Sequence, residues 1–363
     1  MRKLLLILIL TVLTLPAAMA DGGCEGASRY QWISQVIKNG FNIHDSTICY
    51  PRFPRFCLKV YDWGDRTFNS YDTTYVVGTG KNWKLMGKSY NWMEATTLLF
   101  PEDKRLDMHT NLYSDAGARL SFMAVSVGYM WNINKLINSP STRHTFDLSF
   151  TTSRFTLSYQ TLSNEGGMVI TKFGDYAKGQ KLRYHFNNVR LTSKNAEAFY
   201  FFRHRKYSHA AAYSYSKYQL KSAGTWVAGF SFTEQRMHMN FSDLPQDMLE
   251  YLPLESPVYN SHYESYSLLG GYSYNWVLHP RRWMINAYST VAMGYRRVFG
   301  TKRENLMRSL IANNINISVA AVYNHRALFA AGTLKAMGYI NYNSNYYHVN
   351  FYPSITAVVG MRF

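Results

Sequence analysis

The chain has 363 residues, of which 16% are aromatic and only 17% are charged, with a formal net charge of +17. The aromatic residues are spread along the chain among Ser, Asn and Thr, which argues against a soluble protein that gathers them in a core. No two of the three cysteines form a C-x-x-C motif, so zinc-ribbon and thioredoxin-like chemistry are excluded. The positive charge predicts a polyanionic partner.

The first twenty residues have the layout of a secretory signal peptide. Arg2 and Lys3 precede an apolar run over 4–15, and the small residues of 18–20 follow it. Cleavage is predicted after Ala20. Acylation of Cys24 as a lipoprotein is the less favoured alternative, because the residues before it form a poor lipidation box. For an exported chain, nucleic acid is an improbable polyanion, whereas anionic lipid and lipopolysaccharide phosphates are close by.

Residues 21–91 are predicted to form an N-terminal periplasmic segment that leans on the rest of the protein or plugs it. A short helix is expected where the apolar residues around Trp32 share one face, ending at Asn39-Gly40. An oxidising compartment permits a bridge between Cys49 and Cys57, which leaves Cys24 unpaired. Spacing alone does not establish that pairing.

From residue 92 to 363 the dominant signal is alternation with a period of two, typical of strands with two unlike faces. The clearest runs are 119–131, which reads as one strand, and 283–295, which begins with Trp283 and ends with Tyr295. Weaker copies bring the count to about twelve to fourteen. The predicted fold is all-β: a transmembrane antiparallel up-and-down β-barrel.

Short and long connections are expected to alternate along the barrel. Tight turns are predicted at 152–154, 279–281 and 324–326, and longer polar loops at 162–183, 234–263 and 297–312. Short periplasmic turns and long outer loops are the habit of outer-membrane barrels. Within the second loop, residues 244–252 are predicted to form a short amphipathic helix that folds into the barrel mouth as a gate or lies across it.

The end of the chain carries the strongest single signal. Val359, Met361 and the terminal Phe363 lie on one face of an alternating last strand. This arrangement resembles the recognition signal of the outer-membrane assembly machinery, which pairs with the exposed edge of that strand. It predicts a location in the cell outer membrane, with outer-membrane lipid, lipopolysaccharide and the assembly machinery as partners. The oligomeric state is left open.

Several stretches resemble a Bacteroidetes outer-membrane β-barrel family catalogued as a domain of unknown function (family 4421). They are 50–51, 56–61, 71–76, 79–84, 206–208 and 219–224. The resemblance implies a barrel over nearly the whole mature chain. It brings no known activity, ligand or site residue.

Two basic clusters are candidate contacts for lipid or lipopolysaccharide at a membrane rim. The competing interpretation is ordinary snorkelling of long basic side chains at the interface. The residues are Arg203, Arg205, Lys206, Arg296, Arg297, Lys302 and Arg303.

No catalytic residue is predicted. The triplet 44–46, His-Asp-Ser, echoes a hydrolase triad but lies far from the first strand, and the pairs at 208–209 and 261–262 belong to no known motif. Neither a phosphate-binding glycine loop nor an H-E-x-x-H motif occurs, so no cofactor or metal is predicted. The acidic residues of 234–263 lack the spacing of a calcium loop.

The function expected from these features is that of a non-enzymatic outer-membrane barrel with a structural, adhesive or small-solute channel role. A barrel hydrolase acting on phospholipid or lipid A is one alternative, because some small barrels are enzymes. A subunit of a larger cell-envelope complex is the other.

Overall fold

The structure is a computed structural model that describes residues 31–39, 45, 47–100, 104–133, 142–177, 181–252, 256–299, 311–343 and 346–363. Two compact units divide the chain: residues up to Ser70 and residues Tyr71–Arg362. The predicted signal peptide, Cys24 and the residues Lys302 and Arg303 lie outside the described residues.

The first unit is helical. Helix α2 (Gln31–Lys38) confirms the predicted short helix, whereas α3 (Arg52–Phe68) was not predicted beyond an apolar stretch. Cys49 is disulfide-bonded. The side chain of Cys57 is not among those described, so their pairing stays a prediction. Within the described residues, no helix is long and apolar enough to cross a membrane.

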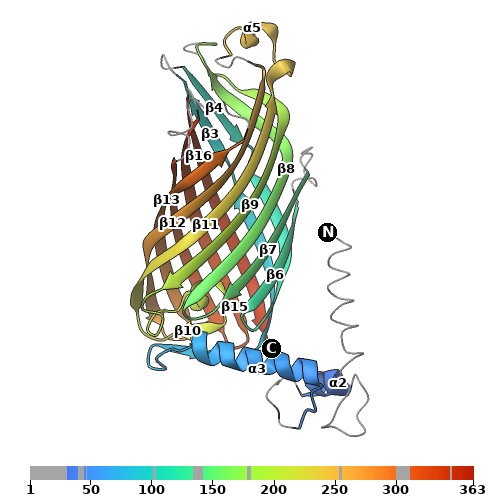
Figure 1. Cartoon of the computed structure of the whole chain (residues 1–363), viewed down its shortest axis with the longest axis vertical. Helices are drawn as coiled ribbons and strands as arrows, with labels where there is room; N and C mark the ends of the chain where they lie inside the picture. The colour runs from blue at the N-terminus through green and yellow to red at the C-terminus, as the bar shows by residue number, and fades with distance from the viewer. Residues whose placement is uncertain are drawn as a thin grey trace. The chain divides into compact units, whose positions relative to one another are not determined.

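The second unit is a closed antiparallel β-barrel (Figure 1). Strand β16 pairs with β15 on one side and with β2 and β3 on the other, so the sheet has no free edge there. The wall strands are β2 (Trp83–Trp92), β3 (Ala95–Leu99), β4 (Arg105–Thr110), β5 (Tyr113–Phe122), β6 (Val125–Asn132), β7 (Thr142–Thr151), β8 (Phe155–Phe173), β9 (Tyr184–Phe201), β11 (Ala223–Asn240), β12 (Val258–His279), β13 (Trp283–Val298), β14 (Ile311–His325), β15 (Leu328–Asn343) and β16 (Tyr346–Arg362).

These segments form a cylinder of twelve strands, which confirms the predicted fold class. Strands β2 and β3 act as one interrupted strand, because both pair with β16. Strands β4 and β5 act as another, because they pair with β3 and β2 respectively. The hairpin β6–β7 is short. Where it ends, β4 pairs directly with β8, so the wall narrows from twelve strands to ten (β3, β4, β8, β9 and β11 to β16).

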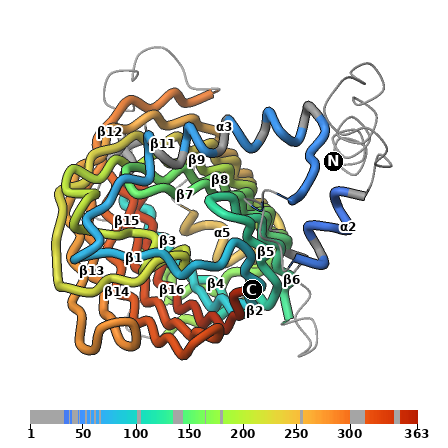
Figure 2. The backbone as a smooth tube through the Cα atoms, turned by 90° about the horizontal axis from the view of Figure 1, so that it is seen from below, coloured from blue at the N-terminus to red at the C-terminus, as the bar shows by residue number. Residues whose placement is uncertain are grey.

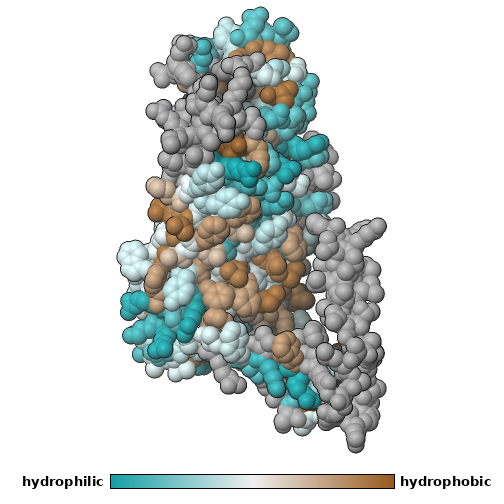
Figure 3. All heavy atoms as spheres, in the orientation of Figure 1, coloured by the Kyte–Doolittle hydropathy of each residue, from teal (hydrophilic) through white to brown (hydrophobic). Residues whose placement is uncertain are grey.

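The outer wall carries an apolar belt, made by every second residue of the strands. On β12 and β13 the outward residues Leu268, Val291 and Met293 are 74%, 61% and 68% exposed, although they are large and apolar. Figure 3 shows hydrophobic residues gathered over the middle of the wall, with hydrophilic ones toward its ends. Trp283 and Tyr295 border the belt on β13, as aromatic girdles do at the two membrane interfaces.

Substitution of an arginine into the apolar belt tests whether the belt faces the hydrocarbon of the membrane. We expect Val291→Arg to lower the free energy of unfolding by ~2–4 kcal/mol, because Val291 lies near the middle of the belt. Tyr295→Arg, on the same strand but at the girdle, should cost only ~0–1 kcal/mol. Urea unfolding of protein refolded into lipid vesicles measures both. Equal costs at the two positions would contradict a lipid-facing belt.

The barrel begins earlier than predicted. Strand β2 occupies residues that were assigned to the N-terminal segment, and the compact barrel unit starts at Tyr71 rather than at residue 92. The run 119–131, predicted as one strand, is a hairpin. A tight turn at Met123, whose φ is 54°, separates β5 from β6. Val125 and Val127 still face outward, as the alternation indicated.

Two loops are shorter than predicted, because β8, β9, β11 and β12 continue far beyond the apolar belt. The loop predicted at 162–183 occupies only 174–183, and the one predicted at 234–263 only 241–257. The three predicted tight turns are confirmed: they connect β7 to β8, β12 to β13 and β14 to β15, all at the end of the barrel where β16 ends.

Candidate functional site: a plug inside the barrel

One connection at the tight-turn end is far longer than the others. Residues 202–222, between β9 and β11, fold back into the barrel instead of turning at once. They contain a short helix, α4 (His209–Tyr213), and strand β10 (Lys217–Gln219). Strand β10 pairs with β1 (Val76–Gly78) from the segment that precedes the barrel wall. Figure 2, which looks at this end, shows β1 crossing the opening. We call residues 71–82 and 202–222 together the plug.

Local sequence explains the shape of α4. The Ser208 hydroxyl caps the helix by accepting a hydrogen bond from the Ala211 amide. The next three alanines are small enough for the helix to sit within the barrel, and all three are buried. The helix therefore packs on the inner wall without a large side chain to displace wall residues.

Hydrogen bonds between uncharged groups join one side of the plug to the wall. The Tyr213 hydroxyl donates to Asn286 Oδ1 at 2.8 Å, and its oxygen lies 3.1 Å from Ser318 Oγ, which can donate to it. The Tyr207 and Ser273 hydroxyl oxygens lie 2.6 Å apart. Asn275 donates from Nδ2 to the Ser208 carbonyl and to Gln219 Oε1, both at 3.0 Å.

Three basic side chains form hydrogen bonds between the plug and the rest of the barrel unit. Lys84 Nζ donates to the Ser214 carbonyl at 2.7 Å, and Arg362 Nε donates to the Tyr215 carbonyl at 2.7 Å. Lys217, on the plug itself, donates to Ser153 Oγ at 2.6 Å. The side chains of Lys84 and Arg362 are almost fully buried. Because a buried charge is expensive unless it is hydrogen-bonded, these contacts hold the plug in one position.

His209 lies in an aromatic environment at the start of α4. Its ring centroid is 4.7 Å from that of Phe201 and 4.6 Å from that of Tyr213. Burial lowers the pKa of His209 to about 3, because the charged imidazolium would lose its water. The side chain is therefore neutral at pH 7 and acts as one more flat ring in the packing.

A second segment packs against the wall at the opposite end of the barrel. Residues 241–257 carry a 3-10 turn, η3 (Phe241–Asp243), and a single helical turn, α5 (Gln246–Leu249). Phe241, Leu244 and Met248 are buried in an apolar cluster at the mouth, with Phe241 stacked on Phe186 at 4.9 Å. The prediction of an amphipathic helix folded into the mouth is confirmed, although only four residues are helical.

Between the plug and residues 241–257, both polar and apolar side chains of the wall face the interior. A cavity of about 30 Å³ lies there, room for roughly two waters. Its lining comes from six of the wall strands and includes the polar residues Asn195, Glu197 and Tyr339 and the apolar residues Leu269 and Met337. Within the described residues, chain segments thus pack into the barrel at both of its ends.

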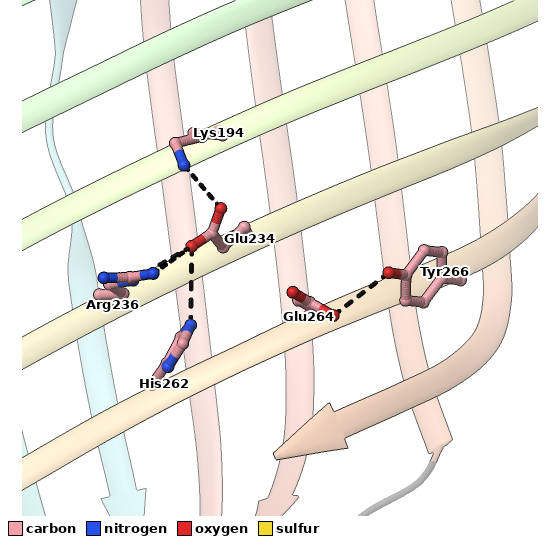
Figure 4. A network of polar contacts seen from close by, with 6 residues as sticks. All are labelled: Lys194, Glu234, Arg236, His262, Glu264 and Tyr266. Carbon is pink, nitrogen blue, oxygen red and sulfur yellow. Dashed lines mark hydrogen bonds and ion pairs between the residues drawn. The ribbon is translucent and has the colours of Figure 1, made fainter. Parts of the chain in front are cut away.

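A different polar network lies on the outer wall (Figure 4). Glu234, on β11, faces outward and forms ion pairs with Lys194 at 2.8 Å and Arg236 at 2.9 Å. His262 Nε2 lies 3.6 Å from the same carboxylate. On β12, the Tyr266 hydroxyl donates to Glu264 at 3.2 Å.

Comparison with known protein families identifies the family of this chain. The family model described as domain of unknown function (DUF4421) matches residues 70–363. The chain belongs to this family. Its predicted source among the Bacteroidetes is not tested by that match and stays a prediction. No curated protein matches the chain.

Distant solved structures share the barrel architecture. They include the outer membrane protease OmpT from Escherichia coli (7% identity, 79% of this chain and 98% of that chain, TM-score 0.32). The translocator domain of the autotransporter NalP from Neisseria meningitidis matches at 9% identity, over 78% and 89%, with a TM-score of 0.35. The β domain of the Bordetella autotransporter BrkA matches at 5%, over 76% and 99%, with a TM-score of 0.36. The strand pairing itself, rather than these matches, defines the fold.

Four of the six stretches that carried the resemblance to the DUF4421 family lie in or beside the plug, whereas 50–51 and 56–61 belong to the first unit. Residues 71–76 and 219–224 meet where Val76 pairs with Gln219. Residues 206–208 lead into α4, and Lys84 ends the stretch 79–84. These stretches are far apart in the sequence, and the barrel brings them to one end.

The two predicted basic clusters lie at opposite ends of the barrel, and their contact with lipid stays a prediction, except that Arg296 does not face the membrane. Arg203, Arg205 and Lys206 begin the plug connection at the tight-turn end, whereas Arg297 lies near the far end of β13. Arg296 is buried inside the barrel, with its guanidinium 4.1 Å from the centroid of the Tyr263 ring. Neighbouring residues of a strand face opposite sides, so Arg296 and Arg297 could not share one surface.

The serine–histidine neighbours do not form a hydrolase site. Ser208 caps α4, and its neighbour His209 stacks on aromatic rings. Ser261 and His262 are consecutive in β12 and point to opposite faces of the wall. Asp45 hydrogen-bonds to Thr47, while residues 44 and 46 lie outside the described part. Among the described residues, no group of three or more His, Cys, Asp or Glu could hold a metal ion.

Sequence reasoning missed the plug contacts Lys84, Asn286 and Arg362. Arg362 had a detectable signal, because it occupies the inward-facing position of the last strand, where a charge needs a partner inside the barrel. The Ala-rich run after Ser208 was the corresponding signal for α4.

Proposed function

We propose that this protein is an outer-membrane barrel that passes small solutes and is held closed by its plug. The observation that carries the proposal is the 202–222 connection, which folds into the lumen at an end where the other connections are tight turns. A barrel with a purely structural role would need only a tight turn of a few residues between β9 and β11. A long inward segment with its own contacts is what a closed passage needs.

The chemistry of the contacts supports a plug that can move. Many of its attachments to the wall are hydrogen bonds from Tyr207, Tyr213 and Asn275 to polar wall or plug groups. Water can replace such bonds when the plug leaves, so each contributes only about 0.5–1.5 kcal/mol.

Removing two plug hydroxyls tests this function. In planar bilayers we expect the wild-type protein to be mostly silent and the double variant Tyr207→Phe and Tyr213→Phe to show frequent openings. The rings keep their packing, but Asn286 Oδ1 and Ser318 Oγ lose the Tyr213 hydroxyl, which costs ~1–3 kcal/mol per unsatisfied group, and Ser273 loses the Tyr207 hydroxyl but keeps its bonds with Asn286 and the Ala287 carbonyl. Open probability should rise roughly tenfold or more.

Tyr263→Phe is the matched control. It also removes one buried hydroxyl inside the barrel, but that hydroxyl donates to Gln235 Oε1 on the wall at 2.6 Å, and the plug takes no part in the bond. The control should stay as silent as the wild type. If the double variant is equally silent while it migrates as a folded barrel, the passage proposal fails, and a structural role becomes the better account.

A further inference from the structure

The outer wall changes character above the apolar belt on one side of the barrel. On β11 the outward residues run from Trp226 and Phe230 to Phe232, and then become Glu234 and Arg236. On β12 the outward Tyr266 is followed, in the same direction, by Glu264 and His262. The Phe232 and Tyr266 rings lie 5.1 Å apart and mark the border of the belt. Polar groups directly beyond such a girdle face lipid head groups.

The carboxylate of Glu234 holds its basic partners with their charged ends outward. Its side chain is only 14% exposed, whereas those of Lys194 and Arg236 are 45% and 62% exposed. One carboxylate shared by two permanent cations leaves a positive excess. Exposed ion pairs add only ~0–1 kcal/mol of stability, so stability alone gives little reason for this arrangement.

Arg297 extends the cluster across β12 to β13. It is paired in register with Glu264, is exposed, and has its guanidinium 4.8 Å from the centroid of the Phe299 ring. The positive charges of Lys194, Arg236 and Arg297 therefore exceed the two negative charges of Glu234 and Glu264 by one. All of these side chains are on the outer wall, out of reach of a solute inside the lumen.

We propose that Lys194, Arg236 and Arg297 bind the phosphate groups of a phosphorylated glycolipid of the outer leaflet. Guanidinium groups fit phosphate oxygens through paired hydrogen bonds, and an ammonium group adds a point charge. The leaflet follows from the topology, because the cluster lies toward the barrel end opposite the tight turns, which is the outer end in outer-membrane barrels. The site depends on the membrane placement of the barrel and not on whether the lumen conducts.

Binding of lipid A by the refolded protein in detergent tests the site. The probe is lipid A that carries two phosphates, with dephosphorylated lipid A, phosphatidylglycerol and inorganic phosphate as comparisons. We expect the double variant Lys194→Gln and Arg236→Gln to bind diphosphorylated lipid A at least about tenfold more weakly than the wild type, since charge-assisted hydrogen bonds are lost. Wild type should prefer it over dephosphorylated lipid A by a similar factor.

Two comparisons make the test specific. Arg203→Gln with Arg205→Gln removes the same charge at the opposite end of the barrel and should leave lipid A binding unchanged. Migration as a folded barrel without heating shows that each variant has folded. Equal binding of the two lipid A forms, equal binding by both double variants, or binding of phosphatidylglycerol or inorganic phosphate as tight as that of lipid A would overturn the proposal.

Discussion

A single methyl group at Gly271 should prevent the barrel from closing, whereas the same change at Gly270 should be tolerated. A Cβ atom at Gly271 would lie 2.0 Å from the Ser289 carbonyl oxygen and 2.8 Å from Thr290 Cα, both on the neighbouring strand. These are backbone atoms, so a rotamer change cannot relieve the overlap. At Gly270 nothing lies within 4 Å of the added atom.

The closed sheet explains why Gly271→Ala should destabilise the barrel strongly. In a closed sheet, β12 cannot move away from β13 without disturbing every other pairing, so we expect Gly271→Ala to cost ~3 kcal/mol or more. Gly270→Ala should change stability by less than ~0.5 kcal/mol. Refolding into vesicles, followed by gel migration with and without heating, separates the two outcomes. A folded, stable Gly271→Ala barrel would mean that the two strands are farther apart than described.

The last strand and the tight turns were predictable because each depends on local sequence. Inward and outward positions of β16 alternate through Val358 and Val359, and the lipid-facing set makes that pattern visible. The turn at 279–281 lies between two such patterns. The last strand and the tight turns could therefore be located without knowing which distant residues they contact.

The true lengths of β8, β9, β11 and β12 were not predictable from hydrophobic alternation. Beyond the belt the outward residues, such as Glu234 and Arg236, are polar. The pattern of apolar outward residues that marks a strand within the belt therefore ends there, although the strand continues. Strand pairing continues there through backbone hydrogen bonds, which the side-chain pattern does not report. The same loss of pattern concealed the polar network of Figure 4.

The plug was hidden for a different reason. Its contacts join residues that are far apart in the sequence, by 130 positions between Lys84 and Ser214 and by 147 between Arg362 and Tyr215. No local period links such residues. The expectation of a plug was attached to residues 21–91, whereas the segment that fills the lumen lies mostly at 202–222.

Acid should release the plug. The pKa of His209 is lowered to about 3 in the closed state by burial, while a released, hydrated His209 would titrate near its ordinary value of 6.5. Above pH 6.5 the side chain is neutral in both states and has no effect. Below it, the released state binds a proton that the closed state does not, so closure weakens by about 1.4 kcal/mol per pH unit down to about pH 3.

Bilayer currents recorded between pH 7.5 and 4.5 measure this effect. We expect the open probability of the wild type to rise by roughly two orders of magnitude over the lower two units of that range. The variant His209→Phe keeps a flat ring between Phe201 and Tyr213 but cannot take up a proton, so its openings should depend much less on pH in this window. The dependence that is left is assigned to His204 in the same plug segment, because burial also lowers the pKa of His204. The pKa of Asp72, in the other plug segment, is lowered from 3.8, so its protonation affects closure only below the range tested. The same rise in His209→Phe would assign the acid response to another group, and a flat wild-type profile would show that α4 stays in place when His209 is protonated or that His209 stays neutral throughout.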